Sequence, residues 1–81
     1  MEVTMYSTRT CPFCYLEKRF LKKNKINFKE IDVSKDSAAA KEMLEKSGQA
    51  VVPQTDINGK IIVGFDKEVL KRELNLIQRQ P

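Results

Sequence analysis

The stretch RTCPFC, Arg9–Cys14, contains both cysteines of the 81-residue chain and spaces them as C-x-x-C. The segment before it, EVTMYST (Glu2–Thr8), is rich in β-branched and aromatic residues and partly alternates, which predicts a strand. A helix is predicted over Pro12–Asn24, because a proline suits the first helical position, where its missing N–H would have no partner anyway. The two cysteines are therefore expected where a strand leads into a helix.

The predicted helix has an apolar side and a basic side. Cys14 and Leu21 lie on one stripe, with Leu16 and Phe20 beside it. The densest basic stretch of the chain, Glu17–Lys25, falls on the same helix, and the net charge of the chain is +4. These charges are typical of a solvated face, since a nucleic-acid-binding protein also needs a recognisable module or stacking aromatic residues. We expect no binding of nucleic acid.

The next two elements are a strand and a helix. NFKEIDV (Asn27–Val33) alternates only loosely, and its residue types and position predict a second strand. A helix is predicted over Ser37–Lys46, with Asp36 or Ser34 as its N-cap and Gly48 at its C-terminal end. The apolar face of this helix is expected to comprise Ala40, Met43 and Leu44.

The last third of the chain predicts a hairpin and a helix. AVVPQTDI (Ala50–Ile57) is typical of a strand interrupted by Pro53, and the Asn–Gly pair at 58–59 is a strong signal for a tight turn into a return strand, Lys60–Val63. Asp66 is expected to cap the final helix. The apolar side of that helix comprises Leu70, Leu74 and Ile77.

The element order is therefore β-α-β-α-β-β-α, which predicts one α/β domain over residues 1–81. The first two strands are joined by a helix and should be parallel with a right-handed crossover, whereas the last two form an antiparallel hairpin. This combination predicts a mixed four-stranded sheet flanked by three helices.

The composition fits a folded globular chain, with 41% apolar and 32% charged residues. No apolar run approaches the roughly 18–20 residues that a membrane span needs. The N-terminal MEVTMYS lacks the basic and apolar segments of a signal peptide. We therefore expect a cytoplasmic protein, a monomer without membrane contact. A reducing compartment also disfavours a permanent disulfide staple.

A C-x-x-C pair can belong to a metal site, a structural staple or a redox-active dithiol. A structural zinc site takes four Cys or His ligands, and this chain has two cysteines and no histidine. We expect no metal site, because only a dimer or a cluster shared with outside thiols would complete one. The position of the pair at a strand–helix junction, inside a β-α-β unit, favours the redox interpretation.

The junction gives the two cysteines different environments. Cys11 falls at the N-cap or just before it, where backbone N–H groups and the helix dipole favour negative charge, and Arg9 adds a positive neighbour. We expect Cys11 to be a thiolate that attacks a disulfide sulfur. Cys14 lies one turn inside the helix, is expected to be shielded, and would resolve the mixed disulfide.

Pro53 is the second informative residue. A proline within a strand pattern indicates an edge or a break, or else a cis bond that turns the backbone and leaves groups of Val52 unpaired. The residues alone leave both alternatives open. If Pro53 lies near Cys11, the backbone of Val52 can pair with an extended peptide or with glutathione.

Three segments together resemble the glutaredoxins, over nearly the whole chain and in the right order. They are MYSTRTCPFC after a strand, VVPQ before a hairpin and VGFD before the last helix. CPFC is similar to the dithiol pattern C-P-[YF]-C, VVPQ to the family's T-V-P segment and GFD to its G-G-x-D segment. The resemblance implies a thioredoxin fold and a thiol–disulfide oxidoreductase that reduces protein disulfides or glutathione mixed disulfides.

The resemblance also implies roles for individual residues. Cys11 matches the nucleophile and Cys14 the resolving cysteine. Phe13 matches the aromatic residue that lines the glutathione groove. Val52 matches the residue whose backbone pairs with the cysteinyl part of glutathione, and Pro53 matches the cis-proline.

Three further residues complete the expected binding set. Asp66 matches the acidic residue that receives the γ-glutamyl amine. Arg9 and Phe65 are also expected to bind the substrate, although both depart from the family pattern. The usual basic residue of the family stands where this chain has Thr8, one position before Arg9, and Phe65 replaces a glycine. A third departure is Val51, which stands in place of the usual threonine.

The resemblance leaves the electron source open. Glutathione is the expected reductant, and no cofactor is expected to be tightly bound. The phenylalanine of VGFD is similar to the NrdH-redoxins, which take electrons from thioredoxin reductase, so thioredoxin reductase or ribonucleotide reductase are alternative partners beside disulfide-containing proteins. A less favoured alternative is a dimeric carrier of an iron–sulfur cluster, against which Cys14 argues, because such relatives usually end the motif in serine.

Overall fold

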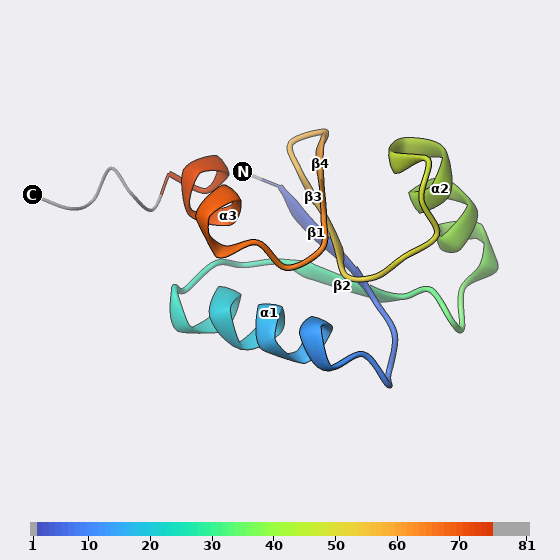
Figure 1. Ribbon diagram of the computed structural model, residues 1–81, viewed down its shortest axis with the longest axis horizontal. Helices are drawn as coiled ribbons and strands as arrows, with labels where there is room; N and C mark the ends of the chain where they lie inside the picture. Colours follow the sequence, from blue (N-terminus) through green and yellow to red (C-terminus); the bar gives the residue numbers. More distant parts are fainter. Residues whose placement is uncertain (1, 76–81) are drawn as a thin grey trace, which may run out of the picture.

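The computed structural model describes residues 2–75, which form a four-stranded sheet with helices on both faces (Figure 1). In chain order the elements are β1 (Val3–Ser7), α1 (Pro12–Lys23), β2 (Lys29–Asp32), α2 (Ser37–Ser47), β3 (Gln54–Ile57), β4 (Lys60–Val63) and α3 (Lys67–Glu73). The predicted order and the mixed sheet with three helices are confirmed. None of these helices is long and apolar enough to cross a membrane.

The strands lie side by side in the order β2-β1-β3-β4. β1 and β2 are parallel, and α1 makes the crossover that a parallel pair requires. β3 is antiparallel to both β1 and β4, and Asn58 and Gly59 turn the hairpin with positive φ angles of 51° and 94°. This register places Met5, Thr55 and Ile62 in one row across β1, β3 and β4.

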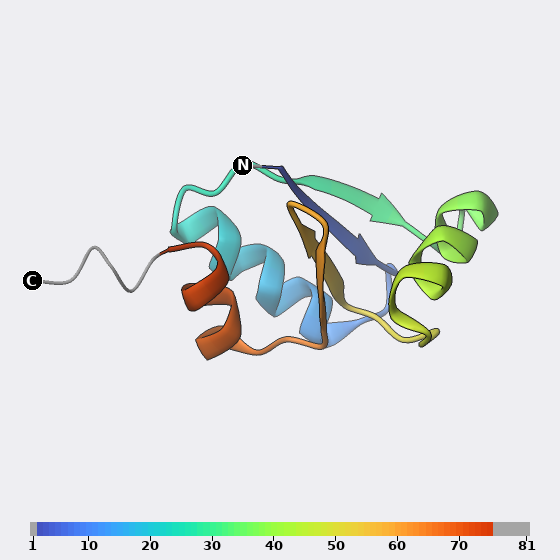
Figure 2. The same cartoon turned by 90° about the horizontal axis from the view of Figure 1, so that it is seen from above.

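The sheet separates two apolar layers, because successive side chains of a strand point to opposite faces. α1 and α3 cover one face and α2 covers the other (Figure 2). Met5 is buried in the first layer, whereas its neighbour Tyr6 is buried in the second. The first layer comprises Val3, Met5, Cys14, Leu21, Ile57, Ile62, Leu70 and Leu74. The second comprises Tyr6, Ala39 and Met43.

Two leucines that were expected on apolar helix faces are exposed instead. Leu16 is 43% and Leu44 45% exposed. The buried residues of α1 are Cys14, Glu17 and Leu21, and those of α2 are Ala39 and Met43. Both sets follow the spacing of three or four residues that keeps side chains on one face of a helix. The predicted apolar faces are therefore confirmed at Cys14, Leu21 and Met43 and are wrong at Leu16 and Leu44.

Pro53 moves the start of β3. The predicted strand Ala50–Ile57 is wrong in its first half, because β3 begins only at Gln54. Residues 50–53 stay outside the sheet, because proline has no N–H to offer a neighbouring strand. The Val52–Pro53 bond is cis. In α3 the predicted apolar residues Leu70 and Leu74 are buried, whereas Ile77 lies outside the described residues.

A polar cluster fastens α2 to the sheet. The Tyr6 hydroxyl donates to Glu42 Oε1 at 2.8 Å, and Lys46 Nζ donates both to the Tyr6 hydroxyl at 3.0 Å and to Asp56 Oδ2 at 2.7 Å. The hydrogen bond to Asp56 is the main reason that the pKa of Lys46 is raised. The cluster joins β1, α2 and β3 with charge-assisted hydrogen bonds.

We predict that Asp36→Ala lowers the free energy of unfolding by about 1 kcal/mol, because Asp36 is the N-cap of α2. Its Oδ1 accepts a hydrogen bond from the N–H of Ala39 at 3.0 Å. Ser34, the other candidate cap, bonds instead to Asp32. Urea denaturation of Asp36→Ala and Ser34→Ala side by side checks the assignment, and a larger loss in the serine variant would contradict it.

Candidate functional site

Both cysteines lie at the N-terminus of α1. Cys11 is the N-cap, with the extended backbone angles φ −101° and ψ 108°, and Pro12 follows at the first helical position. The backbone N–H of Cys14 donates to Cys11 Sγ at 3.1 Å. The two residues are joined by a disulfide, with their Cα atoms 5.2 Å apart. The position predicted from the sequence is therefore confirmed.

The two sulfurs differ in their access to solvent. Cys11 is partly exposed, whereas Cys14 is 2% exposed and belongs to the apolar layer beneath α1. An incoming disulfide can therefore reach Cys11 and not Cys14. A sulfur at a helix N-cap is also the one whose negative charge the backbone N–H groups stabilise.

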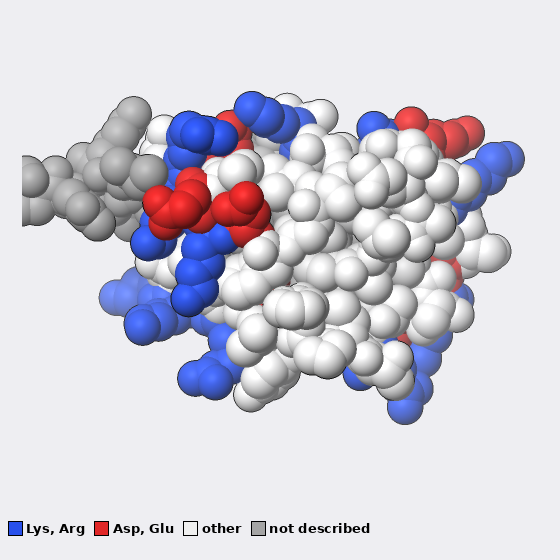
Figure 3. Space-filling model, viewed as in Figure 1, with Lys and Arg blue, Asp and Glu red and all other residues white. Residues whose placement is uncertain are grey.

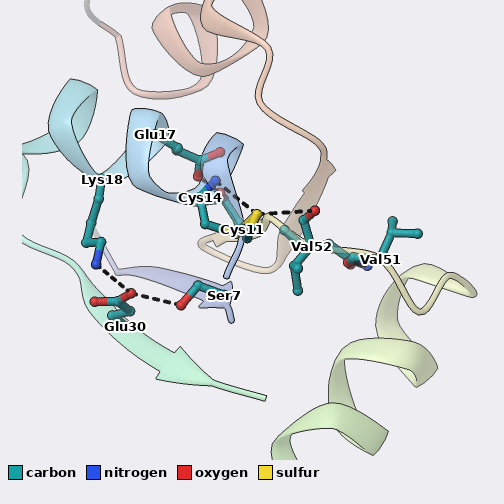
Figure 4. Close-up of a disulfide and its surroundings, with 10 residues drawn as sticks. Ser7, Cys11, Cys14, Glu17, Lys18, Glu30, Val51 and Val52 are labelled. Carbon is teal, nitrogen blue, oxygen red and sulfur yellow. Dashed lines mark hydrogen bonds and ion pairs between the residues drawn. A yellow bond between two sulfur atoms is a disulfide. The ribbon is translucent and has the colours of Figure 1, made fainter. Parts of the chain in front are cut away.

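The segment before β3 passes beside Cys11 (Figure 4). Cys11 Sγ lies 3.8 Å from the carbonyl oxygen of Val52. The sulfur carries no proton while the disulfide is closed, so this is a contact, and only the reduced thiol would make it a hydrogen bond. The Val52–Pro53 bond is cis, as the resemblance implied.

Gln54 braces this segment and was missed by the sequence analysis. It is fully buried, and its Nε2 donates to the carbonyl oxygens of Gln49 and Val51, both at 2.8 Å. By contrast, no backbone hydrogen bond involving Val52 is formed within residues 2–75. Gln54 thus fixes the segment at Gln49 and Val51, while the peptide groups of Val52 remain available for a ligand.

A cleft of about 540 Å³ opens beside the cysteines. Its lining comprises Ser7, Thr8, Arg9, Cys11, Cys14, Tyr15, Lys18, Glu30, Asp32 and Lys35. Lys18 Nζ lies 3.2 Å from Glu30 Oε2, which also accepts a hydrogen bond from the buried hydroxyl of Ser7 at 2.8 Å. Hydrogen bonding by Ser34 is the main cause that lowers the pKa of Asp32. Of the predicted binding residues, the structure brings Arg9 to this cleft.

Three other predicted binding residues, Phe13, Phe65 and Asp66, are absent from the lining of this cleft. Phe13 is 61% exposed on the first turn of α1. Phe65 packs edge-on against Phe20, with their ring centroids 6.0 Å apart. It lines a second hollow of about 380 Å³ together with Leu16, Arg19, Phe20, Lys23 and Lys67. Asp66 caps α3, and its Oδ1 accepts from the N–H groups of Glu68 and Val69.

The surface around these segments is mostly uncharged. In Figure 3 the lysines, arginines and acidic residues gather toward the rim of the face. Its centre, over the connections from α2 to β3 and from β4 to α3, is almost free of charge. A substrate that approaches over this face meets uncharged groups first.

Glu17 is a buried carboxyl group that the sequence analysis placed on the basic side of α1. It is 0% exposed, and its Oε2 accepts a hydrogen bond from the hydroxyl of Thr55. Burial raises the pKa of Glu17 to about 7, and the hydrogen bond from Thr55 opposes that shift. Its spacing of one turn from Cys14 was the signal that could have identified it.

The described residues, 2–75, contain no group of three or more His, Cys, Asp or Glu side chains placed to hold a metal ion. The paired cysteines are thus the chemical feature that distinguishes the site.

Comparison with known proteins identifies the family. The family model described as Glutaredoxin matches residues 3–62. The chain belongs to the glutaredoxin family. It is a glutaredoxin-like thiol–disulfide oxidoreductase, and the cysteine pair at the N-terminus of α1 fits the C-P-F-C pattern.

Individual glutaredoxin-like proteins are similar along most of their length. An uncharacterized glutaredoxin-like 8.6 kDa protein in the rubredoxin operon of Clostridium pasteurianum is 43% identical over 65 residues, which cover 80% of this chain and 87% of that protein. A crystal structure of a mutant of the thioredoxin-like protein BC3987 superposes with a TM-score of 0.88 at 35% identity, covering 91% of this chain and 95% of the other. The NrdH-redoxin of Escherichia coli gives a TM-score of 0.79 at 26% identity, with 89% and 93% covered. The expected thioredoxin fold is thereby confirmed.

Proposed function

We propose that this glutaredoxin-like protein reduces protein disulfides or glutathione mixed disulfides through a Cys11–Cys14 dithiol cycle, with glutathione as its reductant. The observation that carries the proposal is the position of Cys11, an N-cap sulfur that lies 3.8 Å from the carbonyl oxygen of Val52. An attacking sulfur and an available peptide unit are thus side by side, which is the arrangement that an extended peptide disulfide needs.

The cycle balances in two steps. The Cys11 thiolate attacks one sulfur of a substrate disulfide, which forms a mixed disulfide and releases the other substrate sulfur as a thiolate. Cys14, after losing its proton, attacks Cys11 Sγ, so the second substrate sulfur leaves and takes up a proton. Two electrons pass from the dithiol to the substrate, and two molecules of glutathione then restore the dithiol and leave as glutathione disulfide.

Several groups of the chain suit glutathione. The free peptide unit of Val52 matches the cysteinyl backbone, and Asp66 matches the positively charged γ-glutamyl amine. Only Oδ1 of Asp66 is used in the described part of the chain, which leaves Oδ2 for a ligand. Arg9 and Lys35 offer positive charge to the glycyl carboxylate. Phe13 and Phe65 contribute apolar surface.

We predict that Asp66→Asn raises the KM for a glutathione mixed disulfide roughly tenfold, the size expected when one charge-assisted hydrogen bond is lost, with little change in kcat. Asparagine keeps the side-chain oxygen that caps α3. Asp36→Asn is the matched control, because it changes the N-cap of α2 on the other face of the sheet. Steady-state kinetics with glutathione and glutathione reductase provide the measurement, and an equal KM in both variants would count against glutathione binding at Asp66.

A second candidate is an NrdH-type electron donor that is reduced by thioredoxin reductase. The apolar hollow formed by Phe65, Phe20 and Leu16, with cations at its rim, favours contact with a protein partner over a tripeptide. The similarity to the NrdH-redoxin of Escherichia coli is consistent with this alternative. On this alternative, ribonucleotide reductase is the partner that would receive the electrons.

Side-by-side turnover with the two electron sources separates the candidates. The primary proposal predicts reduction of a disulfide substrate with glutathione and glutathione reductase, and little with thioredoxin reductase. The opposite result would select the NrdH-type donor. Both candidates place the protein in the cytoplasm, where these reductants keep thiols reduced.

A further inference from the structure

Glu17 carries a carboxyl oxygen that has no hydrogen-bond partner. The side chain is 0% exposed, Oε2 is bonded to Thr55, and Oε1 is buried without a partner in the described part of the chain. Leaving a buried polar atom unpaired costs stability. Such an atom indicates a function when it lies beside reacting groups.

The reacting group closest along the helix is Cys14. Glu17 follows it by one turn, and both residues belong to the buried face of α1. Side chains three residues apart on a helix are neighbours. In Figure 4 Glu17 extends from α1 on the side where Cys14 and Cys11 lie.

The surroundings of Glu17 contain little that could titrate in its place. β1, β3 and β4 contribute the row Met5, Thr55 and Ile62 to this layer, and α3 contributes Leu70 and Leu74. The charged groups nearby are paired with one another: Lys18 of α1 with Glu30 of β2, and Lys60 of β4 with Glu73 of α3. Within residues 2–75, Glu17 forms no ion pair. Among the described residues, Cys14 is the titratable group that shares the buried face of α1 with Glu17.

The second step of the dithiol cycle needs such a partner. Cys14 must lose its proton before it can attack Cys11 Sγ, because the thiolate is the nucleophile. Only 2% of Cys14 is exposed, so bulk water has little access to its sulfur. An acceptor inside the protein can take the proton from the buried side of the sulfur instead.

We propose that the carboxylate of Glu17 accepts the proton of Cys14 in the resolving step, directly or through one water molecule. The inference rests on the dithiol cycle proposed above and deepens it. The Cys14 S–H bond breaks and an O–H bond forms on Glu17. The Cys14 thiolate then forms the bond to Cys11 Sγ, and the electron pair of the old disulfide leaves on the substrate sulfur. Glu17 then returns the proton, either to the substrate thiolate that has just left or to Cys14 when the dithiol is restored.

The pKa of Glu17, about 7, suits this task, because a base works best when its pKa lies near the working pH. Thr55 tunes it, since its hydroxyl donates to the carboxylate and favours the charged form. Substitutions of Glu17 and of Thr55 should therefore change the pH dependence of the resolving step in different ways.

The test uses dithiobis(nitrobenzoate), a symmetric disulfide that releases one coloured thiolate in each step. Reduced protein is mixed with one equivalent in a stopped-flow instrument between pH 5.5 and 8.5. The first coloured thiolate reports the attack of Cys11, and the second reports resolution by Cys14. We expect the second rate of the unmodified protein to rise with a midpoint near pH 7.

Glu17→Gln should leave the first rate unchanged and slow the second about a hundredfold at pH 7, the lower end of what general-base assistance gives. The midpoint near pH 7 should disappear. Glu45→Gln is the matched control, because it removes the same charge from the exposed side of α2 and should change neither rate. Equal slowing of both steps in Glu17→Gln would assign Glu17 to packing alone and overturn the proposal, as would an unchanged second rate.

Thr55→Val keeps the shape of the side chain and removes the hydroxyl. The midpoint of the second rate should then move to higher pH, because the hydrogen bond from Thr55 lowers the pKa of Glu17. An unmoved midpoint would overturn the proposal even if Glu17→Gln failed to fold. If the unmodified protein released only one coloured thiolate, the dithiol cycle itself would be wrong, which is distinct from a failure of the role of Glu17.

Discussion

Cys11→Ser is expected to lose disulfide reduction entirely, down to the rate without protein. A serine hydroxyl does not ionise near neutral pH, and the reaction proceeds only through a covalent sulfur–sulfur bond. Cys11 is partly exposed at the N-cap, where an incoming disulfide can reach its sulfur. Cys14 is buried and cannot take over the attack. Reduction of a peptide disulfide, followed by the appearance of free thiols, measures the loss.

Cys14→Ser is the matched control for this variant. It keeps the attacking sulfur, so it should release one coloured thiolate from dithiobis(nitrobenzoate) and not the second. Reversed behaviour of the two serine variants would exchange the roles of attacking and resolving cysteine. Circular dichroism of both proteins shows whether α1 remains folded without the disulfide.

Glu17→Gln is expected to stabilise the protein above pH 7, by about 3 kcal/mol relative to the unmodified chain. The pKa of Glu17 is about 7 in the folded state and near 4.5 in the unfolded state. Between these values the folded protein binds the proton more tightly, so stability falls as pH rises from about 4.5 to about 7 and then levels off. Glutamine has no such titration and keeps an acceptor for Thr55.

Urea denaturation at several pH values provides the measurement. The difference in free energy of unfolding between Glu17→Gln and the unmodified protein should be small near pH 4.5 and should reach its full value above pH 7. A difference that does not change with pH would show that Glu17 titrates normally. A variant that is more stable yet slower in the resolving step would be the expected signature of a buried group retained for function.

The sequence predicted the fold because its local signals agree with one another. The β-branched residues of β1, Pro12 at the start of α1, the Asn58–Gly59 turn and the cap at Asp66 each mark one boundary. It was harder to predict from the sequence which apolar residues of each helix face the sheet. Leu16 and Leu44 are apolar but exposed, because packing against the sheet, and not residue type alone, decides which stripe is buried.

The cysteine pair was predictable and its polar environment was not. Cys11 and Cys14 are marked by spacing and by the helix that they begin. Gln54 and Glu17 are ordinary polar residues in sequence, and only the three-dimensional arrangement shows that both are fully buried. A glutamate within a basic stretch is normally solvated, and this expectation outweighed the one signal for burial, the spacing of one helical turn between Glu17 and Cys14.

The N-cap position of Cys11 ties the folding of α1 to the redox state of the protein. The same sulfur that reacts with substrate also accepts the N–H of Cys14 at the first turn. A thiolate is a stronger acceptor than a disulfide sulfur, so the cap should strengthen on reduction. A thermodynamic cycle then requires that whatever the reduced helix gains in stability appears as a more oxidising couple, at about 30 mV for each 1.4 kcal/mol. Comparing the unfolding of the oxidised and reduced forms would therefore measure how far the fold, this hydrogen bond included, shifts the potential of the cysteine pair.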